Sequence, residues 1–283
     1  MEGRDIPGKN ARSRWNVVVP TVRTGIVSQA EPPKDFSSLA PGPSRVRSLE
    51  EIEAQVAAEK TSPEAREYDP SRFYHPAVTV DLVIFTLSEQ DLQVLLVRRE
   101  QWPFKDRWAL PGGFVQQEEA LGMAAHRQLL EETGVSDVFL EQLHTFGHPS
   151  RDPRMRVVTV AYYALVPADK LPPSREGGSV RWWSIYQLPE LAFDHDRILD
   201  LALGRLRRKI MDTNVAFQFM PKKFTLTQLQ QTYEIVLGRA LDKRNFRKKV
   251  LSSGRVTETD EHHLQGRHRP ARLYEFDLEA RDF

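Results

Sequence analysis

The 283-residue sequence contains no cysteine, which excludes disulfides, thiolate nucleophiles and thiolate-bound zinc and makes a reducing cytoplasm the expected setting. No apolar run approaches the length of a membrane span. Glu2 and Asp5 lie where a secretion signal would need apolar residues. The eight histidines show no metal-ligand spacing. These absences predict a soluble cytoplasmic protein with no membrane partner.

The composition allows a sizeable core, because 40% of the residues are hydrophobic. Two domains and a tail are expected from this length. The formal net charge is only +1, but residues 213–283 hold 13 basic and 9 acidic residues, so the remainder of the chain is net acidic. This small asymmetry suggests that the C-terminal part meets a polyanion.

Residues 1–70 are rich in proline, serine, arginine and glutamate and show little periodicity. We predict a mostly disordered extension. Within it, one short helix is expected after Ser48, which would cap the helix together with Glu51 at its third position.

From Tyr74 the sequence changes to strand-like segments, AVTVDLVIFTL and DLQVLLVRRE, with a turn at Ser88-Glu89-Gln90. A helix is predicted from about Glu118 to Glu132, ending at Gly134. Further strands are expected at 137–146, 155–166 and 180–185, followed by a helix near 195–211.

The helix predicted after Gly113 carries a carboxylate cluster. Glu131 and Glu132 lie three and four residues beyond Gln128, so the three side chains share one helix face. Two adjacent carboxylates facing a glycine turn suit Mg²⁺ or Mn²⁺ bound to diphosphate oxygens. Arg127 is spaced to pair with both Glu119 and Glu131. An isolated Glu-Glu pair would be read instead as part of an exposed, charged amphipathic helix.

The full spacing favours the site. It resembles the Nudix box, whose fixed and aliphatic positions are matched by Gly113, Glu119, Arg127, Leu129, Glu131, Glu132, Gly134 and Val135. The resemblance implies an α/β fold, the Nudix α/β/α sandwich, with Glu131 and Glu132 as metal ligands if metal binding is retained.

Gln128 departs from the box, because the Nudix family places there a glutamate that binds metal or acts as the base. An amide cannot accept a proton at neutral pH and is only a neutral ligand. Hydrolysis is therefore in doubt, while nucleotide binding is not. Some Nudix hydrolases take their base from a later loop, for which Glu176 is the candidate here.

Ligand-binding residues are predicted from their position near the box: Arg98, Arg99, Gly113, Phe114 and Arg127. Each has an ordinary surface or core alternative. The segment LPELAFDHDRILDLALGRLRRKI at 188–210 resembles the closing portion of an ADP-ribose-directed Nudix domain. His195 there is expected to cap or pack, with ligand contact as the alternative.

Residues 224–251 predict two helices joined by a glycine turn, the helix-turn-helix pattern. Thr227 and Gln230 are expected to cap the first helix, Gly238 to end it, and Asp242 to cap the second. The second helix presents basic and amide side chains that suit phosphates and base edges, namely Lys243, Arg244, Asn245, Arg247, Lys248 and Lys249. A solvated basic helix is the alternative.

Two strands are predicted after this helix, in GRVTET and ARLYEFDL, with Arg267, Arg269 and Arg272 in the connecting loop. Helix, helix and a basic-tipped hairpin form a winged helix-turn-helix, whose wing would reach the DNA backbone or minor groove. The predicted division is therefore an extension at 1–70, a Nudix-like sensing domain at 73–212 and a winged helix-turn-helix at 213–283.

Over about residues 73–278 the chain resembles the NrtR family of Nudix-related transcriptional regulators of NAD metabolism. The altered box carries this resemblance together with LPELAFDH, KKFTLTQLQ, LGRALDKRNFRKKVL and GRHRPARLYEF. It implies a homodimeric repressor that binds a pseudo-palindromic operator and is released by ADP-ribose or a related nucleotide. The alternatives are a Mg²⁺-dependent hydrolase of ADP-ribose or another nucleoside diphosphate derivative, and an RNA-processing hydrolase. Gln128 argues against both.

Overall fold

A computed structural model describes residues 47–88, 90–171, 179–212, 214–263 and 270–277. The chain divides into two units, residues 1–70 and 71–283. In the first unit, helices α1 (Leu49–Lys60) and α2 (Pro63–Glu67) contain no buried residue. Ser48 and Glu51 form the predicted capping box of α1. Residues 1–46 of the predicted disordered extension lie outside the described residues.

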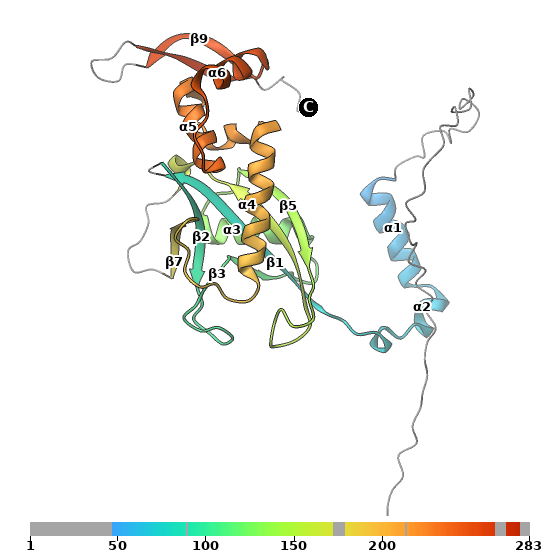
Figure 1. The fold of residues 1–283 in the computed structure, drawn as a ribbon. Helices are drawn as coiled ribbons and strands as arrows, with labels where there is room; N and C mark the ends of the chain where they lie inside the picture. The colour runs from blue at the N-terminus through green and yellow to red at the C-terminus, as the bar shows by residue number, and fades with distance from the viewer. Residues whose placement is uncertain (1–46, 89, 172–178, 213, 264–269, 278–283) are drawn as a thin grey trace, which may run out of the picture. The chain divides into compact units, whose positions relative to one another are not determined.

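The second unit is built from a mixed sheet, two covering helices and a C-terminal helical unit (Figure 1). Its helices are η1 (Pro70–Arg72, at the boundary), α3 (Leu121–Thr133), η2 (Ala168–Lys170), α4 (His195–Asp212), η3 (Asn214–Phe219), α5 (Leu226–Leu237) and α6 (Lys243–Ser252). Its strands are β1 (Ala77–Ser88), β2 (Asp91–Arg98), β3 (Trp108–Ala109), β4 (Gly112–Phe114), β5 (Phe139–Phe146), β6 (Val157–Leu165), β7 (Val180–Ser184), β8 (Lys223–Phe224), β9 (Val256–His263) and β10 (Ala271–Phe276).

Strand β1 organises the larger sheet. Among the described residues, seven strands join in the order β3-β2-β1-β6-β5, with β4 on β1 and β7 on β2. The pair β1–β6 is parallel and the other pairs are antiparallel. Strand β4 pairs with the first half of β1, which brings Gly112 opposite Asp81. The glycine-rich start of the box therefore lies against the middle of β1.

Side chains of β1 alternate between two cores, because successive residues of a strand point to opposite faces of a sheet. Val80, Leu82 and Ile84 pack with Leu129 of α3 on one face. On the other face Val83 and Phe85 belong to a core that includes α4. A sheet between α3 and α4 is the predicted α/β/α sandwich.

The predicted box helix is shorter at its start than expected. It begins at Leu121 rather than near Glu118, because Glu119 accepts hydrogen bonds from the backbone of Gln116 and from Arg127 and so belongs to the preceding turn. It ends as predicted at Gly134, which has a φ of 71°. Glycine adopts this left-handed conformation without steric cost.

The C-terminal unit has the predicted order of helix, turn, helix and hairpin, and β10 also pairs with β8. One prediction was wrong: the capping box of α5 is Thr225 with Gln228, not Thr227 with Gln230. Thr227 already lies inside the helix. Gln230 instead donates to the Glu234 carboxylate at 2.9 Å and to the Leu241 carbonyl at 3.0 Å, which ties the turn to α5.

Gly238 and Asp242 end α5 and begin α6 as predicted. Phe246 and Val250 anchor α6 in the core, and Tyr233 of α5 packs edge-on against Phe246. Across the residues that the structure describes, no helix is long and apolar enough to cross a membrane.

Candidate ligand pocket and nucleic-acid interface

Gln128 is buried within the box and faces its glycine turn. A Cβ built on Gly113 would lie 3.0 Å from Gln128 Nε2, so the absence of a side chain there lets the amide approach the backbone. The Gln128 amide donates a hydrogen bond to Glu131 Oε2 at 2.9 Å. The residue that replaces the family's glutamate therefore acts here as a donor, which a carboxylate could not do when ionised.

Arg127 pairs with both glutamates, as its spacing predicts. Its Nε and Nη2 donate to the two oxygens of Glu119 at 2.7 and 2.8 Å, and its Nη1 lies 3.5 Å from Glu131. The hydrogen bonds from Arg127 hold the pKa of Glu119 at about 2. Arg127 also donates to the Phe114 carbonyl at 3.3 Å, so it fixes the loop that leads into α3.

Two further carboxylates of the box are Glu131, which accepts from Gln128 and lies 3.5 Å from Arg127, and its neighbour Glu132. Burial, together with the charge of Glu131, raises the pKa of Glu132. The described residues hold no group of three or more histidine, aspartate or glutamate side chains placed around one point. Two carboxylates still fit Mg²⁺, which is commonly bound by one or two carboxylates plus substrate phosphates.

Next to the box, a pocket opens between β1, β4, the loop that follows β5 and the start of α4. Gly113 belongs to both the pocket and the box, since it lines the pocket and contacts Gln128. The pocket is lined by Thr79, Asp81, Arg99, Leu110, Gly112, Gly113, Phe114, Arg151, Asp152, Arg154, Val157, Phe193 and His195.

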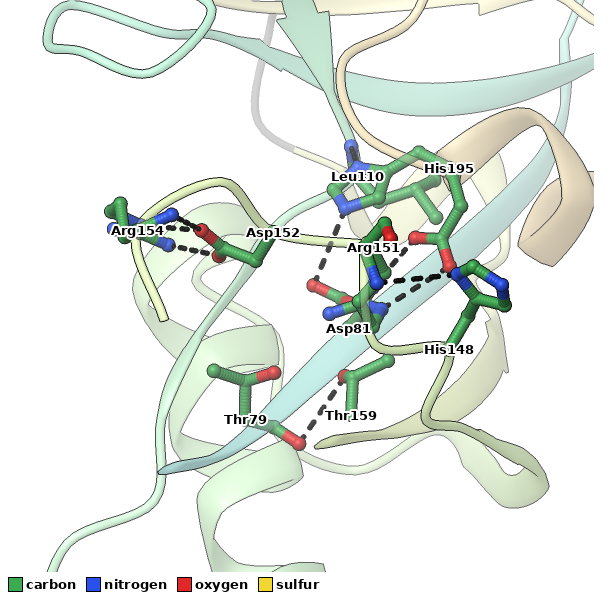
Figure 2. A network of polar contacts seen from close by, with 11 residues as sticks. Thr79, Asp81, Leu110, His148, Arg151, Asp152, Arg154, Thr159 and His195 are labelled. Carbon is green, nitrogen blue, oxygen red and sulfur yellow. Dashed lines mark hydrogen bonds and ion pairs between the residues drawn. The ribbon is translucent and has the colours of Figure 1, made fainter. Parts of the chain in front are cut away.

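Arg151 is the centre of a buried ion-pair network in this pocket (Figure 2). Its Nη2 donates to Asp81 Oδ2 at 3.2 Å and to Asp194 Oδ1 at 2.7 Å, and its Nε donates to Asp194 Oδ2 at 3.2 Å. Only 4% of the Arg151 side chain is exposed. Two carboxylates thus fix the guanidinium in place, which compensates for its desolvation.

His195 is buried beside this network. Its Nδ1 accepts the backbone N–H of Leu110 at 2.9 Å, and its Nε2 lies 3.7 Å from Asp81. Burial lowers the pKa of His195 below its ordinary value, which favours the neutral ring. Because Nδ1 accepts the Leu110 N–H, the proton of the neutral ring lies on Nε2. The expected packing role is what the geometry shows, although the ring also reaches the pocket wall.

Arg99 and Arg154 differ in how they are held. Arg154 makes a bidentate pair with Asp152, at 3.0 and 2.7 Å. Arg99 donates to the Pro103 carbonyl and lies 4.8 Å from the centre of the Phe193 ring. Within the described residues Arg99 has no carboxylate in ion-pair contact, which leaves its charge available to an anion.

Aromatic rings complete the pocket. Phe193 contacts Phe104 edge-on at 4.8 Å between ring centres, and Arg154 lies 5.5 Å from the Phe114 ring. Phe193 has a φ of 57°, which is uncommon for a residue with a side chain. A strained backbone that aims a ring into a pocket is a feature of ligand sites.

The structure separates the predicted ligand residues. Arg99, Gly113 and Phe114 line the pocket, whereas Arg127 lies in the box and supports its loop. Arg98 is exposed and pairs with Asp106 at 3.2 Å, away from the pocket wall. Glu176, the alternative base, lies outside the described residues.

Sequence reasoning missed Asp81, Arg151, Asp152, Arg154 and Phe193. One of them carried a signal: Asp81 interrupts the apolar run AVTVDLVIF, and a charge in a central strand needs a buried partner. Its partner Arg151 is 70 residues away in sequence, so no local spacing could reveal it.

Helix α6 offers the second site. Lys243, Arg244, Asn245, Arg247 and Lys248 are all exposed on its surface. In the part of the chain that the structure describes, none of the four cations has an ion-pair partner. Lys249 differs, because its Nζ lies 3.5 Å from the Met211 carbonyl. Arg244 and Lys248 lie on the face opposite Phe246 and Val250, so two of these cations point away from the core, as a DNA-reading helix requires.

The wing is described only in its strands. Arg272 of β10 pairs with Glu258 of β9. Arg267 and Arg269 fall outside the described residues, so their predicted DNA contacts remain predictions.

Family models match both halves of the second unit. Residues 75–202 match the NUDIX domain, and residues 216–276 match the NrtR DNA-binding winged helix domain. The ADPR responsive transcriptional repressor NtrR of Acinetobacter baylyi is 41% identical over 222 residues, which cover 77% of this chain and 88% of that protein. The chain belongs to the NrtR family. The predicted architecture, a Nudix domain followed by a winged helix-turn-helix domain, is therefore confirmed.

The chain is also similar to a DNA-bound regulator and to an enzyme. A crystal structure of Shewanella oneidensis NrtR complexed with a 27mer DNA is 37% identical and covers 71% of this chain and 93% of its own, with a TM-score of 0.64. The ADP-ribose pyrophosphatase of Methanocaldococcus jannaschii is 36% identical over 127 residues, which cover 45% of this chain and 73% of that enzyme. The regulator similarity spans both domains, and the enzyme similarity spans less of the chain.

Proposed function

We propose that this protein is a cytoplasmic transcriptional repressor that binds double-stranded DNA and is released by ADP-ribose. The observation that carries the proposal is that one compact unit contains both an arginine-rich pocket and an exposed basic helix in a helix-turn-helix. A relative named as an ADPR responsive repressor matches across both parts. The proposed target genes belong to NAD metabolism, and the proposed active form is a homodimer on a pseudo-palindromic operator.

The pocket suits a nucleoside diphosphate. Arg99 has a free charge and Arg154 is positioned by Asp152, so both can bind diphosphate oxygens. The rings of Phe114 and Phe193 offer faces for a base. We propose these four residues, with Gly113, as the ligand contacts.

The box supports sensing rather than turnover. Gln128 carries an amide, which is not basic at neutral pH and so cannot take a proton from water, and it donates to Glu131. Glu131 and Glu132 would hold Mg²⁺, which would neutralise part of the ligand's diphosphate charge. Removing Mg²⁺ would then weaken ADP-ribose binding.

The proposed DNA contacts are Lys243, Arg244, Asn245, Arg247 and Lys248 of α6, with Arg267 and Arg269 of the wing. In a helix-turn-helix the second helix enters the major groove, where arginine reads guanine and asparagine reads adenine. The proposed domain boundaries remain 73–212 for sensing and 213–283 for DNA binding.

A mobility-shift assay tests the proposal directly. The probe is the DNA upstream of the gene that encodes the chain, with a shuffled duplex as control, run with and without ADP-ribose and with product analysis on the same samples. We expect a specific shift that ADP-ribose weakens while the ligand stays intact. ADP-ribose cleavage at ordinary enzymatic rates without preference for any duplex would instead identify a hydrolase.

The variant Gln128→Glu tests the eroded box. A carboxylate at this buried position restores the family's acidic residue beside Glu131, so we expect Mg²⁺-dependent ADP-ribose hydrolysis to rise above that of the parent. Gln117→Glu, at an exposed position before the helix, adds the same charge and serves as the control. Equal rates in both variants would mean that the loss of hydrolysis lies elsewhere.

A further inference from the structure

Helix α4 connects the ligand pocket with the winged helix. Its first residue, His195, lines the pocket and accepts the Leu110 N–H. Twelve residues later Arg207 reaches α5, a span of roughly 18 Å at 1.5 Å per residue. Figure 1 shows α4 running along the sheet to the C-terminal helices. Ile198 and Leu206 of α4 share one core with Val236 of α5. The helix is thus supported along its length.

Two hydrogen bonds between the two domains lie at the C-terminus of α5. The last carbonyls of a helix have no partner within it and need donors from elsewhere. Arg207 Nε donates to the Val236 carbonyl at 3.0 Å, and Tyr186 Oη donates to the Ile235 carbonyl at 3.2 Å. Both donors come from the Nudix domain. The Ile235 carbonyl also accepts the Gly238 N–H at 3.3 Å, so the Nudix domain adds a second donor at Ile235 and supplies a donor at Val236.

Gly238 makes this contact possible. It has a φ of 68°, and a Cβ built on it would lie 3.1 Å from Tyr186 Oη and 3.6 Å from Arg207 Nη2. Both side chains therefore lie against the glycine that ends α5.

Tyr186 is also connected to the pocket. It follows β7, which pairs with β2 over five residue pairs, and Arg99 directly follows β2. The Ile185 N–H, one residue before Tyr186, binds the Leu92 carbonyl at the other end of β2 at 3.0 Å. Separate elements therefore connect the pocket with the two donors. Strands β2 and β7 lead to Tyr186, and helix α4 leads to Arg207.

A shift at the end of α5 would reach α6. Glu234 of α5 accepts the Leu241 N–H at 2.8 Å, and Gln230 donates to the Leu241 carbonyl, so the turn moves with α5. Asp242 then caps α6 through the Asn245 N–H at 2.8 Å. The orientation of α6 and of its exposed cations therefore depends on the position of the C-terminus of α5.

We propose that Tyr186 and Arg207 form the joint that couples ligand occupancy to the orientation of α6, and hence to DNA affinity. This inference rests on the proposed function and adds the residues that transmit the signal. They are positioning residues: neither lines the ligand pocket and neither belongs to the exposed face of α6. Ligand contacts at Arg99 and Phe193 would bias the joint through β2 and α4.

The test uses the full chain with Tyr186→Phe, which removes one hydroxyl, and Arg207→Ala. Arg208→Ala is the matched control, because it removes the same charge from the exposed neighbour. Three affinities are measured: for the upstream duplex alone, for ADP-ribose alone, and for the duplex with saturating ADP-ribose. Effectors typically change affinity about 5- to 150-fold. We expect this factor to fall at least about fivefold in both variants, with each separate affinity within about twofold of the parent.

Linkage supplies an independent readout, because the duplex must weaken ADP-ribose binding by the same factor. If ADP-ribose changes duplex affinity by the same factor in Tyr186→Phe, Arg207→Ala and Arg208→Ala, the coupling role of Tyr186 and Arg207 is wrong. The proposed function would not be affected by that result. Loss of duplex binding in Tyr186→Phe without ligand would also overturn the coupling role, since the contact would then only build the DNA-binding fold. A parent protein whose duplex affinity ignores ADP-ribose would overturn the proposed function itself, and the joint with it.

Discussion

The ligand pocket and helix α6 both present cations, but they hold them in opposite ways. In the pocket, Arg151 and Arg154 are fixed by carboxylates, and Arg151 is also buried. On α6, Lys243, Arg244, Arg247 and Lys248 are exposed. Fixed charges suit one small anion of defined shape, because little ordering remains to be done on binding. Exposed, hydrated charges suit a long polyanion whose counterions they displace.

The largest expected effect comes from Arg151→Ala. The change leaves Asp81 and Asp194 without their shared cation, and breaking a buried pair costs about 3–5 kcal/mol. Denaturant unfolding monitored by fluorescence measures this. Arg244→Ala on the exposed face of α6 is the comparison and should change stability by no more than about 0.5 kcal/mol. Similar losses of unfolding free energy in both variants would show that the pocket cations are no more important for stability than those of α6.

The same Arg244→Ala variant should fail in DNA recognition. An arginine that reads a base contributes about 1–3 kcal/mol of discrimination, so preference for the upstream duplex over a shuffled one should fall roughly 5- to 150-fold. Competition binding measures the ratio, and ADP-ribose affinity should be unaffected. An unchanged preference would show that Arg244 does not contact a base in the major groove.

The next effect is a pH dependence that arises from His195 in the pocket. His195 is neutral and buried, and its pKa lies below the ordinary value of about 6.5. As the pH falls below about 6.5, His195 becomes protonated in the unfolded chain but stays neutral in the folded chain. The free energy of unfolding therefore declines by at most about 1.4 kcal/mol per pH unit. The loss ends at the lower pKa of the folded state.

His195→Gln should remove this component of the pH profile, whereas His126→Gln on the exposed face of α3 should retain it. Unfolding free energies between pH 7 and pH 5 provide the measurement. Parallel profiles for the parent and His195→Gln would show that the ring is not the group responsible.

The smallest effect is expected from Lys248→Ala. An exposed cation that contacts one phosphate changes the slope of log K against log salt by about 0.9 and weakens all duplexes alike. Lys105→Ala removes an equally exposed charge from the Nudix domain and should leave the slope unchanged. ADP-ribose binding should show a weaker salt dependence, because its partners are partly buried.

The sequence predicted most of the fold because its signals are local. The ends of α3 and α5 follow from Gly134 and Gly238, and the N-terminus of α6 follows from Asp242. The cap of α5 was misplaced by two residues, because Thr225-Gln228 and Thr227-Gln230 have the same spacing. Only the packing of the turn, which takes up Gln230, separates the two.

What the sequence by itself determined is the box, the altered position at Gln128 and the basic face of α6, since each depends on spacing along one helix. Tertiary structure alone decided the pocket and the joint. Asp81, Arg151 and His195 come from segments far apart in the chain and meet because β1, the loop after β5 and α4 converge. Tyr186 and Arg207 find the end of α5 in the same way, because helix carbonyls can accept donors from any segment that folding brings within reach.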